Sequence, residues 1–192
     1  MSVRSGPAAP AAWAVAAIKE ESVVLDIGTG SGCLAVSVAV HAEETTIHAL
    51  DISNAAINVA RANAERHGVA ERIIFHEGDA RVALPGTCLF DVIVSNPPYI
   101  PSAEIESLQI EVRDHDPRLA LDGGLDGLEF YRSLAVSCLS RLRSDGRLLL
   151  EVGDGQGEVV ADLITAQGGR VLEILPDLNN IERIVVASAD NS

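Results

Sequence analysis

Residues 22–41 read SVVLDIGTGSGCLAVSVAVH, an apolar run, a glycine-rich turn and a second apolar stretch in direct succession. The β-branched run Ser22–Ile27 predicts a buried strand, and Cys33–His41 predicts a helix. Between them, the three glycines of Gly28–Gly32 allow the backbone to turn tightly and to pass close to a ligand. A strand that turns through glycines into a helix predicts the opening unit of a doubly wound α/β sheet.

The alternation of strand-like and helix-like segments continues along the chain. Further strands are predicted over Thr45–Leu50, Arg72–His76, Phe90–Ser95, Arg147–Val152, Arg170–Leu175 and Ile181–Ala187, and further helices over Ser53–His67, Leu125–Leu142 and Gly157–Gln167. Repeated βα units predict an α/β fold with a mostly parallel, seven-stranded sheet and helices on both faces. The last two strands have no helix between them, which predicts that the final strand runs antiparallel. Nicotinamide-binding domains, by contrast, have all-parallel sheets.

Composition limits the size, the setting and the partners. The chain has 192 residues, the size of one ordinary domain, and a formal net charge of −14. No cluster of Lys or Arg occurs, which disfavours nucleic acid as a partner unless a second subunit supplies positive charge. Cys33, Cys88 and Cys138 are scattered, so the sequence predicts no disulfide framework, no metal site and a reduced, cytoplasmic setting. No apolar run approaches the ~20 residues of a membrane span.

Residues 1–21 precede the first predicted strand and are rich in alanine from Ala8 to Ile18. Pro10 interrupts this stretch, which argues against a secretory signal and favours a short helical lead-in that packs on the sheet. Residues 22–192 are expected to form the single folded domain.

Carboxylates follow the second and third predicted strands. Asp51 comes 19 residues after Gly32 and is placed to accept hydrogen bonds from both hydroxyls of a ribose. Asp79 is placed to accept from an adenine amino group. The GxGxG spacing, rather than GxGxxG, favours a nucleoside without a pyrophosphate, such as S-adenosylmethionine. Either aspartate alone is better explained as a solvated carboxylate; their succession along one sheet edge favours a site.

Asn96-Pro97-Pro98-Tyr99 follows the fourth predicted strand. The two prolines stiffen the turn and leave carbonyl groups free to accept hydrogen bonds. Asn96 adds an acceptor and a donor, and Tyr99 adds a flat aromatic face. This set suits a planar group that carries an NH₂, either an amide or an exocyclic base amine. The alternative is that the tetrapeptide is only a turn after a strand.

Four stretches of the chain resemble the protein-(glutamine-N5) methyltransferases that act on peptide chain release factors, the HemK family. They are LDIGTGSG at residues 25–32, DVIVSNPPYIP at 91–101, LALDGGLDGLEFYR at 119–132, and 150–156 with Glu151, Gly153 and Gln156. The first two occur in many amino-methyltransferases, including those that act on adenine. The third looks specific to this family and favours it.

The resemblance implies a Rossmann-like class I methyltransferase domain over residues 22–192, without the family's usual N-terminal helical domain. It implies transfer of the methyl group of S-adenosylmethionine to the amide of the glutamine in a release factor's Gly-Gly-Gln motif. The residues that would hold the glutamine are Asn96, Pro97, Pro98 and Tyr99. Those that would bind or border the cofactor are Asp26, Gly28, Thr29, Gly30, Ser31, Gly32, Asp51, Ile52, Asp79, Ala80 and Asn96.

Two other functions remain open from the sequence. The first is N6-methylation of adenine in RNA or DNA, because the same tetrapeptide would grip an adenine amine. The net charge of −14 argues against it. The second is a non-catalytic paralogue that binds the cofactor or a partner. A separate subunit that recognises the release factor is a further possibility.

Overall fold

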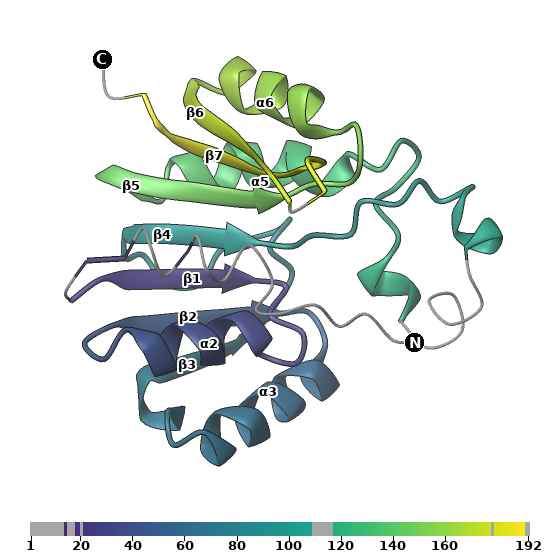
Figure 1. Cartoon of the computed structure of the whole chain (residues 1–192). Coiled ribbons are helices and arrows are strands. Elements are labelled where there is room, and N and C mark those ends of the chain that lie inside the picture. The colour runs from purple at the N-terminus through teal and green to yellow at the C-terminus, as the bar shows by residue number, and fades with distance from the viewer. Residues whose placement is uncertain (1–13, 15–17, 20, 109–116, 178, 191–192) are drawn as a thin grey trace.

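The structure, a computed structural model, describes residues 14, 18–19, 21–108, 117–177 and 179–190 (Figure 1). Its strands are β1 (Val23–Ile27), β2 (Thr46–Asp51), β3 (Ile73–Glu77), β4 (Phe90–Ser95), β5 (Leu142–Glu151), β6 (Gly169–Pro176) and β7 (Glu182–Ala189). Its helices are α2 (Cys33–His41), α3 (Asn54–Arg66), α5 (Glu129–Leu139) and α6 (Gly157–Ala166). Single 3₁₀ turns occupy Ala70–Arg72, Ile105–Ser107 and Arg118–Ala120.

The strands form one seven-stranded sheet in the order β3-β2-β1-β4-β5-β7-β6. The pairs among β3, β2, β1, β4 and β5 are parallel, whereas β7 runs antiparallel to both β5 and β6. This arrangement confirms the predicted α/β fold and the predicted reversal of the last strand. The parallel strands point their carboxyl ends to one side, from which the segment after β4 extends (Figure 1).

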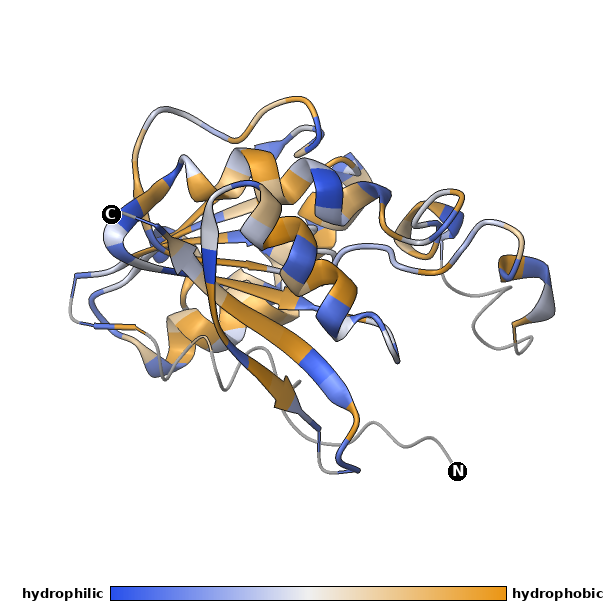
Figure 2. Cartoon of the chain, turned by 90° about the horizontal axis from the view of Figure 1, so that it is seen from above, coloured by the Kyte–Doolittle hydropathy of each residue, from blue (hydrophilic) through white to orange (hydrophobic). Residues whose placement is uncertain are grey.

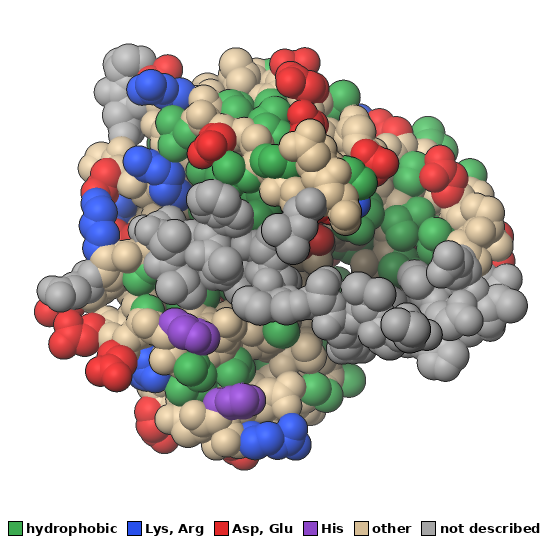
Figure 3. Space-filling view, in the orientation of Figure 1, with side chains coloured by type: hydrophobic (Ala, Val, Ile, Leu, Met, Phe, Trp, Pro, Cys, Tyr) green, Lys and Arg blue, Asp and Glu red, His purple; other side chains and the backbone are tan. Residues whose placement is uncertain are grey.

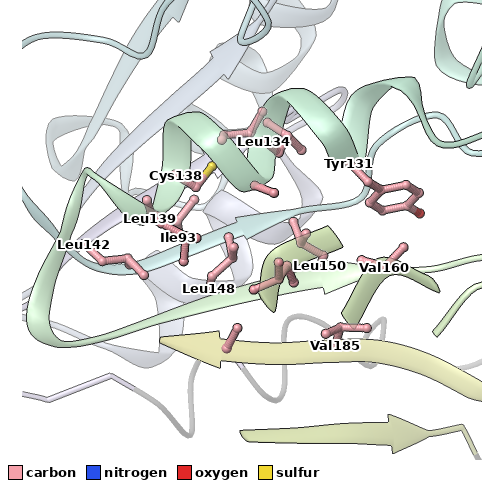
Figure 4. Packing of buried hydrophobic residues seen from close by; sticks show 14 of the residues in the cluster. Ile93, Tyr131, Leu134, Cys138, Leu139, Leu142, Leu148, Leu150, Val160 and Val185 are labelled. Atoms are coloured by element: carbon pink, nitrogen blue, oxygen red, sulfur yellow. The ribbon is translucent and has the colours of Figure 1, made fainter. Parts of the chain in front are cut away.

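Helices cover both faces of the sheet, as predicted. On one face, Leu25, Ile93 and Leu148 pack in the same buried cluster as residues of α5 and α6. Figure 4 shows Ile93 and Leu148 in this cluster from close by. On the other, Val24 and Val92 pack with residues of α2 and α3. Neighbouring residues of one strand therefore pack on opposite faces of the sheet, because side chains alternate between the two faces along a strand. Seen from above, the central strands are largely hydrophobic and lie between the helices (Figure 2).

Three predicted boundaries around α5 and β5 differ from the structure. The helix expected from Leu125 begins only at Glu129, because Gly127 has φ +74° and the Asp126 side chain accepts from the backbone N–H of Leu128. Both features build a turn in place of the first helical residues. The helix also ends three residues early, since β5 begins at Leu142, where it pairs with Phe90, rather than at Arg147.

The predicted lead-in over residues 1–21 lies mostly outside the described residues. Of its alanine-rich stretch, Ala14 is fully buried and Ile18 is partly buried, and both pack in the cluster beneath α2 and α3. Among the described helices, none is long and apolar enough to cross a membrane. On the face shown in Figure 3, Lys and Arg side chains lie scattered among Asp and Glu rather than gathered in one patch.

Candidate functional site

The register of the sheet places three predicted site residues side by side. Ile27, the last residue of β1, pairs with Leu50 of β2 on one side and with Ser95 of β4 on the other. The next residues along these strands are Gly28, Asp51 and Asn96, so they meet at one edge of the sheet. This edge is formed by the carboxyl ends of parallel strands, where α/β proteins bind ligands.

The glycine-rich turn is held in place by the end of β2. The backbone N–H groups of Gly28 and Thr29 donate to the Leu50 carbonyl at 2.8 and 3.0 Å. The next N–H, that of Gly30, donates to Asp51 Oδ2 at 2.8 Å. At the end of the turn, Gly32 has φ +77°, and a Cβ built there would lie 2.8 Å from the Cβ of Ala60 on α3. Only glycine lets the start of α2 approach α3 this closely.

Asp51 presents a carboxylate whose orientation is fixed. Its Oδ2 accepts from Gly30 N–H, and its Oδ1 accepts from Ser53 N–H at 2.9 Å. Each carboxylate oxygen has a second lone pair, so both can still accept from a ligand. Ile52, which follows, is 47% exposed, a large apolar side chain open to solvent beside this carboxylate. A ribose with two hydroxyl donors fits such a group.

Asp26 lies beneath the turn rather than on its surface. It is 3% exposed, and its Oδ2 accepts from the Thr29 hydroxyl at 2.7 Å and from Ala35 N–H at 3.2 Å. Burial raises the pKa of Asp26 to about 6, although the two hydrogen bonds oppose that shift. The carboxyl group thus joins the turn to the first residues of α2. This placement supports the turn and leaves only 3% of the residue exposed.

Asp79 has a partner that the sequence analysis missed. Arg81 forms an ion pair with it at 2.8 Å, and this guanidinium lowers the pKa of the Asp79 carboxyl. The same arginine reaches Glu129 of α5 at 3.1 Å and lies over the Phe130 ring. An adenine amino group would therefore share Asp79 with Arg81.

Ala80, predicted to lie by the adenine, is 8% exposed and packs in the cluster beneath α5 and α6. A hollow of about 330 Å³ at the end of β3 is lined in part by Leu50, Glu77, Gly78 and Asp79. The structure thus brings open space to Asp79, while the Ala80 side chain belongs to the core.

The Asn96–Tyr99 segment is anchored at both ends. Before it, the buried Ser95 hydroxyl donates to the Ile27 carbonyl of β1 at 2.9 Å. Asn96 itself is exposed, Pro97 is buried, and Tyr99 is partly buried. Burial raises the pKa of the Tyr99 phenol, and nearby Glu151 acts in the same direction. The ring therefore stays neutral and presents an aromatic face rather than a charge.

Beyond Tyr99 the chain runs beside the turn that precedes α5. The Ile100 N–H donates to the Leu121 carbonyl at 3.0 Å, and the Ile100 carbonyl accepts from Gly123 N–H at 2.9 Å. The Gln156 side chain, from the turn between β5 and α6, donates to the Tyr99 carbonyl at 3.0 Å. Both contacts fall in stretches that carried the family resemblance, but no role could be given to them from sequence. In the sequence, the glycines of residues 121–127 were the signal that could have indicated a close approach of two backbone segments.

Comparison with known proteins adds to this geometry. Residues 13–115 match the model of the methyltransferase small domain family. Release factor glutamine methyltransferases of Geobacter sulfurreducens and Gloeobacter violaceus are 44% and 48% identical to the chain, over 85% and 86% of its length. The alignments cover 57% and 58% of those two proteins, so the chain spans little more than half of the curated relatives it matches.

A solved structure shows the likeness of fold. The ribosomal protein L11 methylase of Lactobacillus delbrueckii subsp. bulgaricus superposes with a TM-score of 0.68 over 93% of this chain and 77% of its own, at 18% identity. With the strand order, this confirms the predicted Rossmann-like class I methyltransferase fold. The family match over residues 13–115 covers more than half of the chain, so the chain belongs to the methyltransferase small domain family.

Proposed function

We propose that the chain is the methyl-transferring domain of an S-adenosylmethionine-dependent protein-(glutamine-N5) methyltransferase. Its acceptor would be the side-chain amide of the glutamine in the Gly-Gly-Gln motif of a peptide chain release factor. The names of the relatives at 44% and 48% identity support this choice of substrate. Because the chain spans only part of those relatives, recognition of the release factor would draw on residues or a subunit beyond the described domain.

The meeting of the two predicted loops is the observation that carries the proposal. A Cβ built on Gly28 would lie 3.9 Å from the Asn96 carbonyl oxygen, in ordinary van der Waals contact. The glycine turn and the acceptor tetrapeptide thus adjoin at the ends of β1 and β4. A cofactor held on one would present its reactive group to a substrate held on the other.

The residues at this edge fit S-adenosylmethionine. The oriented carboxylate of Asp51 would accept from the two ribose hydroxyls, and the Gly28–Gly32 backbone would lie against the methionine part. Asp79 would accept from the adenine amino group beside the hollow at the end of β3. When bound, the cofactor supplies an activated methyl group on a positively charged sulfur, so the chain needs no covalent nucleophile.

The remaining task of the protein is to orient the acceptor amide. An amide nitrogen is a weak nucleophile because its lone pair is delocalised into the carbonyl. The Asn96 side chain and the Pro97 carbonyl would accept from the two N–H bonds, and the Tyr99 ring would fix the plane of the amide. Transfer would replace one of the two N–H protons of this amide by the methyl group that the cofactor supplies, and the displaced proton would leave to water. Positioning of this kind contributes several kcal/mol to catalysis.

A methyl-transfer assay tests the proposal. Purified release factor, its Gln→Ala variant in the Gly-Gly-Gln motif, bulk tRNA and DNA are offered as acceptors with radiolabelled cofactor. We expect label only on the intact release factor. Label on tRNA or DNA instead would make the chain a nucleic-acid methyltransferase, and binding of the cofactor without any transfer would favour a non-catalytic paralogue.

Asn96→Ala tests whether the glycine turn binds the cofactor while the Asn96–Tyr99 segment binds the acceptor. We expect transfer to fall by about 100-fold or more, because the amide loses an oriented acceptor. The dissociation constant of the cofactor, measured by calorimetry, should stay within about twofold of the unsubstituted protein. Asn58→Ala, on the exposed side of α3, is the matched control and should change neither. If cofactor binding collapsed with Asn96→Ala, Asn96 would belong to the cofactor site.

A further inference from the structure

Gln156 joins two segments that meet only in the folded protein. Its Nε2 donates to the Tyr99 carbonyl at 3.0 Å, across 57 residues of sequence. Its Oε1 accepts from the Gly153 N–H at 3.0 Å. The amide therefore uses both of its ends, one on the acceptor tetrapeptide and one on the turn that follows β5.

Three glycines complete the surroundings of Tyr99, and none has room for a side chain. A Cβ on Gly127 would lie 2.3 Å from the Tyr99 carbonyl oxygen and 3.0 Å from Gln156 Nε2. One on Gly123 would lie 2.8 Å from the Tyr99 Cα, and one on Gly153 would lie 2.9 Å from its Cδ2. We call Gly123, Gly127, Gly153 and Gln156 the Tyr99 cradle. It holds the backbone and the ring of this residue on several sides.

The tetrapeptide needs such an external support. Pro97 and Pro98 have no backbone N–H, so this stretch cannot be tied into the sheet by a regular ladder. Ser95 anchors its start through the hydroxyl bond to β1. At its end, the peptide group that joins Tyr99 to Ile100 is held on two sides: its N–H donates to the Leu121 carbonyl at 3.0 Å, and its carbonyl accepts from Gln156 at 3.0 Å.

We infer that Gln156 is a positioning residue for the acceptor: its hydrogen bond to the Tyr99 carbonyl fixes the plane of the tyrosine ring and the direction of the Pro97 carbonyl. This inference rests on the proposed function, since it assigns the acceptor to the Asn96–Tyr99 segment. Gln156 contacts neither the glycine turn nor Asp51 through any described hydrogen bond. Its loss should therefore affect the transfer step and leave cofactor affinity unchanged.

Gln156→Glu separates the two hydrogen bonds of this side chain. A carboxylate can still accept from the Gly153 N–H, but it has no proton to donate and would repel the Tyr99 carbonyl oxygen. When protonated, the same carboxyl donates again. We expect kcat of Gln156→Glu to fall by about 100-fold at pH 8 and to recover relative to the unsubstituted protein as the pH is lowered towards 5.5. Gln156→Leu should lose a similar factor at both pH values, because it cannot donate in either state.

Gln167→Glu, on the exposed end of α6, is the matched control and should behave like the unsubstituted protein at both pH values. A pH-independent loss in Gln156→Glu, or no loss at all, would overturn the inference. Weakened cofactor binding in both Gln156 variants would also overturn it, because the role would then be structural.

Hydrogen exchange gives a readout that does not depend on the acceptor. At pH 8, Gln156→Glu should expose amides in peptides covering residues 99–101 and leave those covering the glycine turn protected. If no release factor is methylated but this local exposure appears, the proposed function fails and the support of Tyr99 by Gln156 stands. If methylation occurs and neither exchange nor kcat responds to the variant, the positioning role fails and the function stands.

Discussion

The buried carboxyl group of Asp26 should make the stability of the folded protein depend on pH. We consider the change Asp26→Asn, which removes the titratable group and keeps an oxygen acceptor of the same reach. That oxygen can still accept from the Thr29 hydroxyl and the Ala35 N–H, both of which bond to a single oxygen of the aspartate. The variant therefore removes the charge of the carboxylate and keeps its two hydrogen bonds.

The magnitude follows from the shift in pKa. Burial raises the pKa of Asp26 from 3.8 to about 6, so the folded state binds a proton more tightly than the unfolded state. Stability from this group is present in full below the unfolded pKa and is lost as the pH rises through the folded pKa. A shift of about two pKa units corresponds to about 3 kcal/mol. Between about pH 4 and pH 7, the contribution of Asp26 to the free energy of unfolding of the unsubstituted protein should therefore fall by about 3 kcal/mol.

Urea unfolding followed by circular dichroism, without cofactor, measures this dependence at several pH values. The free energy of unfolding of Asp26→Asn, minus that of the unsubstituted protein, should rise by about 3 kcal/mol from pH 4 to pH 7. Asp162→Asn, on the exposed side of α6, is the control and should show a flat difference. A flat difference for Asp26→Asn would refute the reasoning, because burial would then have no net effect on the proton affinity of Asp26.

Two further changes test the packing around the site. Gly32→Ala should destabilise the protein by about 1–3 kcal/mol and weaken cofactor binding, because the new methyl group would meet Ala60 at 2.8 Å and alanine is strained at φ +77°; unchanged urea midpoint and cofactor affinity would contradict this. Tyr131→Phe removes the hydroxyl that donates to the Glu151 carbonyl at 2.8 Å. Thermal unfolding should show a loss of about 1 kcal/mol, and a gain in stability would exclude a useful hydrogen bond there.

The positions of Asp51 and Asn96 could be predicted from the sequence because local patterns determine them. Each follows an apolar run of strand length, and parallel strands bring such ends to one edge. The register then confirmed that both lie beside Gly28. The same reasoning was wrong about the start of α5, because the turn there depends on the positive φ of Gly127, which an apolar pattern does not reveal.

Contacts between distant loops could not be predicted in this way. The bond from Gln156 to Tyr99 depends on how two turns, 57 residues apart, fold towards each other. The pairing of Asp79 with Arg81 depends on the turn after β3, where the backbone N–H groups of Val82 and Ala83 donate to the Asp79 carbonyl. The pattern of strands predicts at which edge of the sheet a side chain lies. It does not predict which side chains from irregular segments contact that side chain.

The place of β7 in the sheet has a consequence for synthesis on the ribosome. This strand is the last of the described strands to be translated, yet it lies between β5 and β6. Until residues 182–189 leave the exit tunnel, β5 has an open edge next to Leu148 and Leu150, and β6 has no strand to pair with among the other described strands. A nascent chain halted before Glu182 would expose a buried apolar strand edge to other chains. The sheet of this domain should therefore be completed only when the final strand inserts between β5 and β6.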